Sequence, residues 1–333
     1  MICGNKMGNV LVTGATGRVG KHLVDALLKS GEEVRVLIRK EMTEFENVGT
    51  VYGDMLDKES LKKAVEGIDT VFHLAAVVDY SASEDLMFRT NVIGTKNLLE
   101  VFKGNNFIYL SSTAVLGKSL KKLPADENTP YSPSNFYGRT KMEAEKMVKE
   151  NGGIIIRSPD VLMPRFTEGY DLIFSKLLDG KMPIIGDGKN FIDYIHINDL
   201  INALLLVKEK GKKNEIYIVS GKGVKTQREC LEIAAKYLEV EPPKNHISVF
   251  SAKISTFGSV LKSKFGGRRE FIPEYIEKIT RNRSYDITKA KNELGFEPEV
   301  DMETSIKEMV GDYLERLKEE KEEVTEKQSE QQT

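Results

Sequence analysis

About the first 160 residues alternate short, largely apolar runs with amphipathic segments. Runs without regular polar positions predict strands that are buried on both faces, because a solvated face would show a polar residue at every second position. The segments between them repeat apolar residues at helical spacing. Alternating strands and helices indicate a parallel sheet with helices on both faces. The expected strands are 10–13, 33–38, 48–52, 70–74, 107–111 and 154–157, and the clearest helices are 58–65, 84–102 and 135–150.

Beyond Arg157 the pattern becomes irregular, because prolines break it into short pieces. Two later strand–helix pairs are expected to return to the sheet, 192–195 with 198–207 and 215–219 with 227–238. We therefore expect an α/β protein with a doubly wound Rossmann-type parallel sheet and a smaller C-terminal lobe over the carboxyl ends of the strands. The expected boundaries are 8–165 plus 190–240 for the sheet domain, 166–189 plus 241–313 for the lobe, and 314–333 for a charged flexible tail.

The first strand stops at a turn with three glycines, Gly14, Gly17 and Gly20. An amphipathic segment, 21–29, follows at once, so this stretch predicts a strand, a tight turn and a helix start. Backbone N–H groups at a helix start bind anionic groups well. Gly14 would permit the turn, Gly17 the approach of a pyrophosphate to the backbone, and Gly20 the packing of the helix on the sheet. The stretch is therefore a candidate dinucleotide-binding turn.

Bulk properties narrow the function classes. The chain has 333 residues, 40% of them apolar, and a net charge of −2, which argues against a general nucleic-acid partner. Its apolar runs are too short for a membrane span, and the N-terminus lacks the apolar core of a signal peptide. Cys3 and Cys230 lack metal-ligand spacing, so we expect reduced thiols, no metal site and a cytoplasmic protein.

A candidate catalytic group lies at the fifth strand and the helix after it. Ser111 and Ser112 end the strand, and Tyr137 and Lys141 open the helix, one turn apart on the same face. A phenol with a pKa near ~10 is a poor proton relay at neutral pH. An ammonium at ~4 Å would stabilise the phenolate by about 3–4 kcal/mol, which lowers that pKa by ~2–3 units. A serine hydroxyl would hold a substrate oxygen for proton transfer.

The same tyrosine–lysine spacing recurs at Tyr285 and Lys289. That pair lies outside the alternating region, and no serine pair ends a strand shortly before it. We interpret it as structural.

Together these motifs resemble extended short-chain dehydrogenase/reductases, the group that includes nucleotide-sugar epimerases and dehydratases, dihydroflavonol reductases and 3β-hydroxysteroid dehydrogenases. The resemblance runs nearly end to end and omits only the N-terminal extension and the charged tail. It implies a seven-stranded, mainly parallel sheet, a C-terminal substrate lobe, and homodimers that pair the helices near 84–102 and 135–150. The matching segments are 13–20, 53–55, 73–76, 91–95, 111–112, 137–141, 157–164, 186–199 and 285–295.

Carried over by position, Ser112, Tyr137 and Lys141 match the catalytic triad of this group, and Lys141 would also bind the nicotinamide ribose. Ser112 is preferred to Ser111 by its distance from the following Gly117. Among the implied coenzyme-binding residues, Asp54 would meet the adenine amino group. The full implied set is Gly14, Thr16, Gly17, Arg18, Val19, Gly20, Asp54, Met55, Leu74, Ala75, Ala76, Tyr137, Lys141, Pro159 and Val161.

The end of the second strand indicates which coenzyme is preferred. An acidic residue there would bind the adenosine ribose of NAD, whereas an arginine suits the 2′-phosphate of NADP. The strand ends in Arg39 and Lys40, and Arg18 in the glycine turn could be a second phosphate ligand. We expect NADP, with NAD as the alternative.

Three functions fit these motifs. The first is an oxidoreductase that transfers a hydride between the nicotinamide and a carbonyl or secondary alcohol of a small organic substrate, with Tyr137 as proton relay. This matches the dihydroflavonol-reductase-like and 3β-hydroxysteroid-dehydrogenase-like branch. The second is a nucleotide-sugar epimerase with tightly bound NAD(P); a dehydratase is disfavoured, because Ala114 and Val115 replace its acidic pair. The third is a coenzyme-binding regulator, but such proteins often lose the tyrosine or lysine.

Other residues carry weaker signals. His73 and His196 are interpreted as structural and Arg157 as a buried structural cation, while Arg281 and Arg283 could clamp a diphosphate or be solvated charges. Asp79 and Tyr80 lie on the expected substrate path. The aromatic residues of the lobe suit an apolar ring, a lipid or a nucleotide sugar: Phe166, Tyr170, Phe174, Phe250, Phe257 and Phe265.

Overall fold

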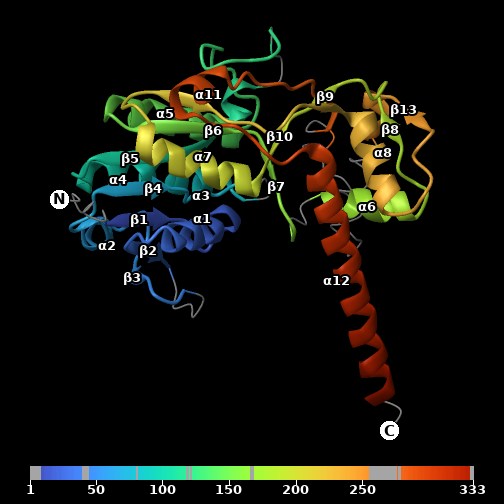
Figure 1. Cartoon of the computed structure of the whole chain (residues 1–333), viewed down its shortest axis with the longest axis horizontal. Coiled ribbons are helices and arrows are strands. Elements are labelled where there is room, and N and C mark those ends of the chain that lie inside the picture. Colours follow the sequence, from blue (N-terminus) through green and yellow to red (C-terminus); the bar gives the residue numbers. More distant parts are fainter. Residues whose placement is uncertain are drawn as a thin grey trace, which may run out of the picture. The chain divides into compact units, whose positions relative to one another are not determined.

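Three separate stretches of the chain make up each of two structural units. The structure, a computed structural model, describes residues 9–39, 45–79, 82–117, 120, 122–165, 169–254, 276 and 279–330, with backbone alone for 323–330. Unit 1 comprises Met1–Pro159, Ile197–Ser220 and Tyr285–Glu297. Unit 2 comprises Asp160–His196, Gly221–Ser284 and Pro298–Thr333. Their helices and strands are labelled in Figure 1.

Unit 1 is built on a seven-stranded sheet in the order β11-β6-β5-β4-β1-β2-β3, in which all neighbours are parallel. This confirms the expected Rossmann-type α/β fold. Strands β1, β4 and β6 are buried along their whole length and β5 along most of it, which explains why they read as apolar runs. The strands are β1 Val10–Thr13, β2 Val34–Ile38, β3 Gly49–Tyr52, β4 Thr70–His73, β5 Asn106–Ser112, β6 Ile154–Ser158 and β11 Ile216–Ile218.

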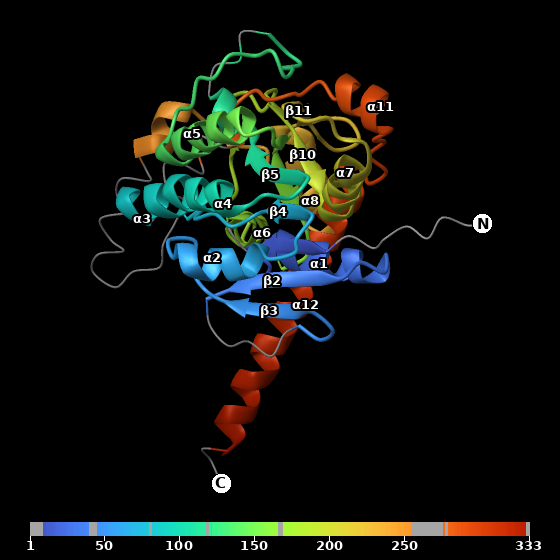
Figure 2. The same ribbon diagram turned by 90° about the vertical axis from the view of Figure 1, so that its left-hand side faces the viewer.

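Helices cover both faces of this sheet (Figure 2). One face carries α1 (Arg18–Lys29), α7 (Ile197–Lys210) and α11 (Thr288–Leu294). The other carries α2 (Lys58–Val65), α4 (Thr95–Val101) and α5 (Phe136–Glu150), whose apolar sides close over a core that includes Leu11, Val71 and Tyr109. The sheet is therefore doubly wound.

The segment expected as one helix over 84–102 contains three pieces. They are α3 (Glu84–Phe88), a π-helical stretch η1 (Arg89–Gly94) and α4. A π-turn inserts an extra residue and rotates the side chains that follow it, and such turns occur often at functional sites.

Among its described residues, unit 2 holds three small sheets and a second core. The strand expected at 192–195 does not return to the large sheet: β10 (Tyr194–His196) pairs with β7 (Asp160–Leu162) inside unit 2. The strand expected at 215–219 does join the large sheet as β11, but the helix expected after it, α8 (Gln227–Tyr237), belongs to unit 2 and packs on α12 (Met302–Glu330) and α6 (Tyr170–Leu178). The remaining strands are β8 Ile184–Ile185 with β13 His246–Ile247 and β9 Phe191–Ile192 with β12 Lys225–Thr226.

The boundaries of the units differ from those expected in four places. Residues 160–165, 190–196 and 221–240 fall in unit 2, while Tyr285–Glu297 joins unit 1, where α11 packs on α7 and β11. Helix α12 continues to Glu330, where a tail from residue 314 was expected. Its middle is held by Arg316, which donates to both carboxylate oxygens of Asp171 at 2.8 and 2.9 Å. None of the helices described is long and apolar enough to cross a bilayer.

A buried ion pair joins α5 to β6. Arg157 and Glu145 are 1% and 0% exposed, and the guanidinium Nη2 lies 2.8 Å from the carboxylate Oε2. The Tyr131 hydroxyl donates to the same oxygen at 2.8 Å, and its ring lies against the guanidinium. Arg157 is therefore a buried structural cation, as the sequence predicts.

Replacing Arg157 by Met should lower the free energy of unfolding by about 3–5 kcal/mol, because Glu145 would remain buried without its counter-charge. The double variant Arg157→Met, Glu145→Leu should recover most of that loss, since an apolar pair carries no desolvation cost. Urea unfolding of the wild type and the two variants measures both effects. Equal losses in the single and double variants would contradict this account.

Candidate functional site

The parallel register of unit 1 brings the motif residues to one edge of the sheet. Thr13 at the end of β1 lies opposite His73 of β4, and Ser112 of β5 lies opposite Ser158 of β6. From β1 the chain adds β2 and β3 on one side of the sheet, and then β4, β5, β6 and β11 on the other. The β1–β4 junction is therefore the topological switch point, where open α/β sheets bind ligands. The glycine turn, the segment after β4 and the serine end of β5 all open onto this edge.

The glycine turn has the shape that a pyrophosphate needs. Gly14 has φ +73°, and a Cβ there would lie 2.7 Å from the backbone nitrogen of Ala75. A Cβ on Gly20 would lie 2.2 Å from the Gly14 carbonyl oxygen, so α1 can begin this close to the strand only with glycine. Gly17 caps α1, whose first turn contains no acidic residue. The exposed backbone of Thr16, Gly17 and Arg18 thus forms a cradle that fits an anionic group.

The other implied coenzyme contacts are distributed along this edge, with two exceptions. Arg39 is exposed directly after β2, and Asp54 is partly buried, its Oδ1 accepting from the Leu56 N–H at 2.9 Å. Met55, by contrast, is only 7% exposed and belongs to the core beneath α4. Val161 lies on β7, which belongs to unit 2. A partly buried residue of α1, the partly buried residues after β4 and the buried residue after β6 complete the set: Val19, Leu74, Ala75, Ala76 and Pro159.

Serine and tyrosine lie on elements that touch. Ser112 ends β5, and its Oγ accepts from the Ala114 N–H at 3.2 Å, which starts the 3₁₀ turn η2 (Thr113–Leu116). Helix α5 packs on this turn, and a Cβ on Gly138 would lie only 2.7 Å from the Ala114 carbonyl oxygen. The glycine after Tyr137 therefore permits the first turn of α5 to approach the end of β5. Ser112 is partly exposed, whereas Ser111 is buried.

Lys141 is buried beneath β5. It is 3% exposed, its Nζ donates to the Leu110 carbonyl oxygen at 2.7 Å, and Nζ lies 4.4 Å from the centre of the Tyr109 ring. Burial lowers the pKa of Lys141 to about 7, with Glu145 acting in the opposite direction. The amine therefore changes charge near neutral pH, which a lysine on the surface does not.

His73 is fully buried at the end of β4. Its Nδ1 lies 2.7 Å from Thr13 Oγ1 and its Nε2 lies 2.8 Å from Thr95 Oγ1. Burial, and then the charge of Lys141, lowers the pKa of His73 to about 3, so the ring is neutral. It is a packed strand-end histidine with both nitrogens bonded.

The second tyrosine–lysine pair has structural contacts in the described part of unit 1. Tyr285 is 8% exposed within a small core, and the amine of Lys289 donates to Glu215 and to the Ile216 carbonyl oxygen. This agrees with the structural interpretation.

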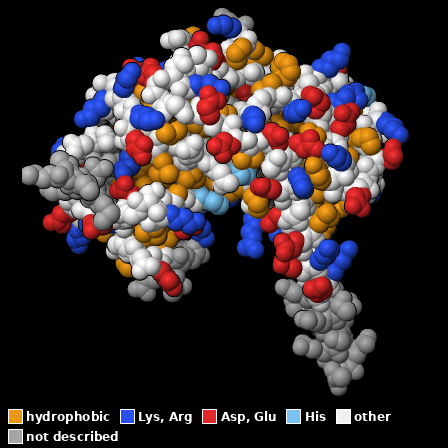
Figure 3. Space-filling view, viewed as in Figure 1, with side chains coloured by type: hydrophobic (Ala, Val, Ile, Leu, Met, Phe, Trp, Pro, Cys, Tyr) orange, Lys and Arg blue, Asp and Glu red, His pale blue; other side chains and the backbone are white. Residues whose placement is uncertain are grey.

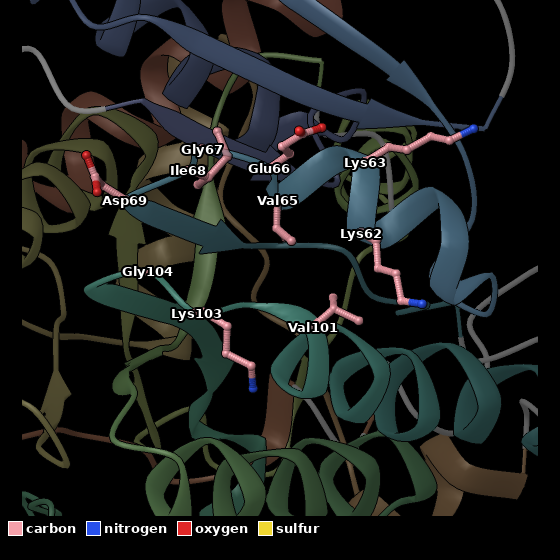
Figure 4. A pocket seen from close by; sticks show the side chains of 10 residues that line it. All are labelled: Lys62, Lys63, Val65, Glu66, Gly67, Ile68, Asp69, Val101, Lys103 and Gly104. Carbon is pink, nitrogen blue, oxygen red and sulfur yellow. The ribbon is translucent and has the colours of Figure 1, made fainter.

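A hollow of about 590 Å³ lies at the opposite edge of the sheet, between the ends of α2 and α4 (Figure 4). Ile68 and Asp69 border it just before β4, and Gly104 just before β5. Lys62, Lys63 and Lys103 surround it at helix C-termini, where cations stabilise the helix dipole. These lysines have a structural explanation, and the hollow is remote from the glycine turn along the strands.

Several expected substrate contacts belong to unit 2 or lie outside the described residues. Tyr80, Phe166, Phe257 and Phe265 lie outside them, as does Lys40 of the expected phosphate site. Asp79 is exposed in unit 1. The others are in unit 2, where Phe174 is buried in the core, Phe250 is 73% exposed, and Arg283 lies 3.3 Å from the Asp160 carboxylate. His196 lies 3.0 Å from Glu308.

Acidic and basic side chains are interspersed over the face shown in Figure 3.

Sequence reasoning missed a set of buried polar residues around this site. Asn91, Thr95 and Thr140 are between 0% and 2% exposed and hydrogen-bonded to one another or to the segments that carry the site. Two of them stand in a matching segment, 91–95, yet their contacts reach residues distant in the chain, which apolar periodicity does not reveal.

Comparison with known proteins gives the family. A sequence profile described as the NAD dependent epimerase/dehydratase family matches residues 10–220, and one for GDP-mannose 4,6 dehydratase matches residues 167–309. The chain is 30% identical to an uncharacterized protein of Sinorhizobium fredii over 90% of this chain and 77% of that protein. It is 28% identical to a 3-beta-hydroxysteroid dehydrogenase of Mycolicibacterium neoaurum over 92% of each chain.

Solved structures show the same fold. The UDP-glucose 4-epimerase of Thermotoga maritima matches with a TM-score of 0.74 and 24% identity, over 93% of this chain and 99% of that one. The whole fold, the glycine turn and the sequence profile agree. The chain therefore belongs to the NAD-dependent epimerase/dehydratase family and is an NAD(P)-dependent enzyme of the oxidoreductase type.

Proposed function

We propose that this protein is an NADP(H)-dependent oxidoreductase that acts on a carbonyl or secondary alcohol of a small organic substrate. The observation that carries the proposal is the buried amine of Lys141, one helical turn from Tyr137, at the strand edge that also carries the glycine turn. When bound, the nicotinamide supplies or accepts the hydride.

Tyr137 relays the proton to or from the substrate oxygen. Lys141, in its ammonium form, stabilises the phenolate, so the two groups titrate as a coupled pair. A lysine pKa of about 7 means that this charge is present below neutral pH and is lost as pH rises. Ser112, partly exposed and retaining its own hydroxyl hydrogen, donates to the substrate oxygen and holds it near Tyr137.

The coenzyme roles follow from the cradle. The residues from Gly14 to Gly20 hold the pyrophosphate, and Asp54 meets the adenine. Leu74, Ala75 and Ala76 border the ribose and nicotinamide, where Lys141 also binds the ribose hydroxyls. Pro159 fixes the carboxamide. Arg39, exposed at the end of β2, pairs with the 2′-phosphate and gives the preference for NADP.

A nucleotide-sugar epimerase is the second candidate, favoured by the epimerase/dehydratase family profile over residues 10–220 and by an epimerase structure of the same fold. Against it, Arg283 is paired with Asp160 rather than held ready for a diphosphate. The two candidates are separated by the purified protein: retained coenzyme without net redox change supports the epimerase, and exchangeable NADPH oxidised by carbonyl compounds supports the oxidoreductase.

The proposal includes a homodimer through α3, α4 and α5. Leu86 and Phe88 are 46% and 42% exposed on α3, which packs on α5. Apolar side chains at such a face are typical of a subunit interface.

Tyr137→Phe should lower kcat about 10²- to 10⁴-fold, because the proton relay is lost. Tyr285→Phe, at the same spacing from a lysine, is the matched control and should retain turnover. NADPH oxidation over a panel of ketones and aldehydes measures both. Turnover intact in Tyr137→Phe, with a folded protein, would refute the assignment.

Arg39→Asp should lower the ratio of kcat/KM for NADPH to that for NADH about 10- to 100-fold, since a charge-assisted contact becomes a repulsion. Lys62→Asp makes the same change of charge at the opposite edge of the sheet, where its side chain is 59% exposed, and should leave the ratio unchanged. An unchanged ratio in Arg39→Asp would show that the 2′-phosphate is recognised elsewhere.

The buried amine also predicts how stability depends on pH. The pKa of Lys141 is about 7 in the folded protein against 10.5 for an unperturbed lysine, so between these values the unfolded chain binds more protons. The free energy of unfolding should therefore rise with pH from about 7 to about 10, by at most about 1.4 kcal/mol per pH unit. Lys141→Met should lack this contribution in urea unfolding across that range. Parallel pH dependences in the two proteins would contradict the low pKa.

A further inference from the structure

A line of buried hydrogen bonds starts beside the glycine turn. Thr13, the last residue of β1, lies 2.7 Å through its Oγ1 from Nδ1 of His73. The other ring nitrogen, Nε2, lies 2.8 Å from Thr95 Oγ1, and Thr95 donates to the Asn91 carbonyl oxygen at 2.7 Å. All four side chains are between 0% and 1% exposed.

The line continues from η1 to the helix that carries Tyr137. The Asn91 amide Nδ2 donates to Thr140 Oγ1 at 3.0 Å, and Thr140 donates to the Tyr137 carbonyl oxygen at 2.8 Å. The Asn91 amide also holds the backbone of Val77, accepting from its N–H at 2.7 Å and donating to its carbonyl at 3.0 Å. Asn91 is thus bonded both to α5 and to the segment that follows β4.

The direction of every bond in this line can be assigned. The hydroxyl hydrogen of Thr95 must go to the Asn91 carbonyl, because a carbonyl only accepts. Thr95 therefore accepts from His73, which fixes the neutral tautomer with hydrogen on Nε2, and Nδ1 accepts from Thr13. By the same reasoning Thr140 gives its hydrogen to Tyr137 and accepts from Asn91.

Such a line is sensitive to the loss of any member. A buried donor or acceptor left without a partner costs more free energy than a bond gains, so each member keeps its neighbours in one arrangement. The π-turn η1 supplies Asn91, and Thr95 follows it directly as the first residue of α4, so its hydroxyl reaches the Asn91 carbonyl four residues back.

We propose that this line holds α5 in register with the coenzyme-binding edge of the sheet, and that Thr95 and Thr140 are positioning residues for Tyr137. The role in catalysis rests on the proposed function; the coupling of the two segments does not. Neither threonine touches the reacting atoms in this proposal, because each acts through the backbone of α5 or of the segment after β4.

The variants remove one hydroxyl at a time without changing shape: Thr95→Val and Thr140→Val, each with its serine counterpart as rescue. Thr70→Val is the matched control, since Thr70 is 4% exposed at the other end of β4 and outside the line. Hydrogen–deuterium exchange of the full-length protein follows the backbone of residues 74–77 and 136–141.

Each valine variant should raise exchange about tenfold in both segments, including the one remote from the change. The serine variants and Thr70→Val should leave both segments as in the wild type. Increased exchange confined to the segment beside the substitution, or none, would overturn the proposal. If one valine variant does not fold, the other tests the same line.

A second measurement uses NADPH and a carbonyl compound that the wild type reduces. Both valine variants should lower kcat about tenfold with KM for NADPH unchanged, and should raise the apparent pKa of the kcat–pH profile, because the tyrosine–lysine pair is no longer held in place. The double variant should lose less than the product of the two single effects, as members of one line do. Multiplicative losses with an unmoved pH profile would overturn the positioning role. If no carbonyl compound is reduced, the proposed function fails while the exchange experiment still decides the coupling.

Discussion

The site depends on burying one amine beneath a β-strand. Lys141 leaves water to donate to the Leu110 carbonyl of β5, and its charge is therefore unfavourable enough to be lost near neutral pH. That position also fixes where Tyr137 can be, because the two residues share a helix face. A lysine exposed to solvent would stay protonated at neutral pH. It would also leave the position of Tyr137 relative to β5 unfixed. The chemistry thus follows from the docking of α5 on β5.

Helix α5 has two buried charged side chains, Lys141 and Glu145, and each is compensated differently. Glu145 is balanced by Arg157 across to β6, with Tyr131 adding a hydrogen bond. Lys141 has a carbonyl oxygen and an aromatic face instead of a carboxylate partner. The Glu145–Arg157 pair stays charged and fixes the helix, whereas Lys141 can change its protonation state. One helix therefore combines a permanent anchor with a titratable group, at a spacing of one turn.

The coenzyme edge and the catalytic helix meet through backbone contacts that only glycine allows. Gly14 brings the first turn against Ala75, and Gly138 brings α5 against Ala114. A side chain at either position would separate the elements that the site needs together. The hydrogen-bonded line from Thr13 to Tyr137 crosses the same region through side chains, so the two halves of the site are joined both by close approach and by directed bonds. In unit 2, the Arg283–Asp160 pair and the exposed Phe250 give a surface of mixed polarity.

Local pattern in the sequence was sufficient for the strands of the large sheet, the glycine turn, the extent of α5 and the tyrosine–lysine spacing, because each depends on residues close together in the chain. It also gave the doubly wound sheet, since alternating strands and helices leave few other arrangements. The partner of the strand near 192–195, the π-turn at Arg89–Gly94, the core position of Met55 and the extent of α12 were decided by contacts between distant residues. The pKa of Lys141 and the tautomer of His73 belong to the same class. Periodicity can be read from a short stretch of sequence. Burial, the pairing partner of a strand and the direction of a hydrogen bond are set by contacts between distant residues, which exist only in the folded chain.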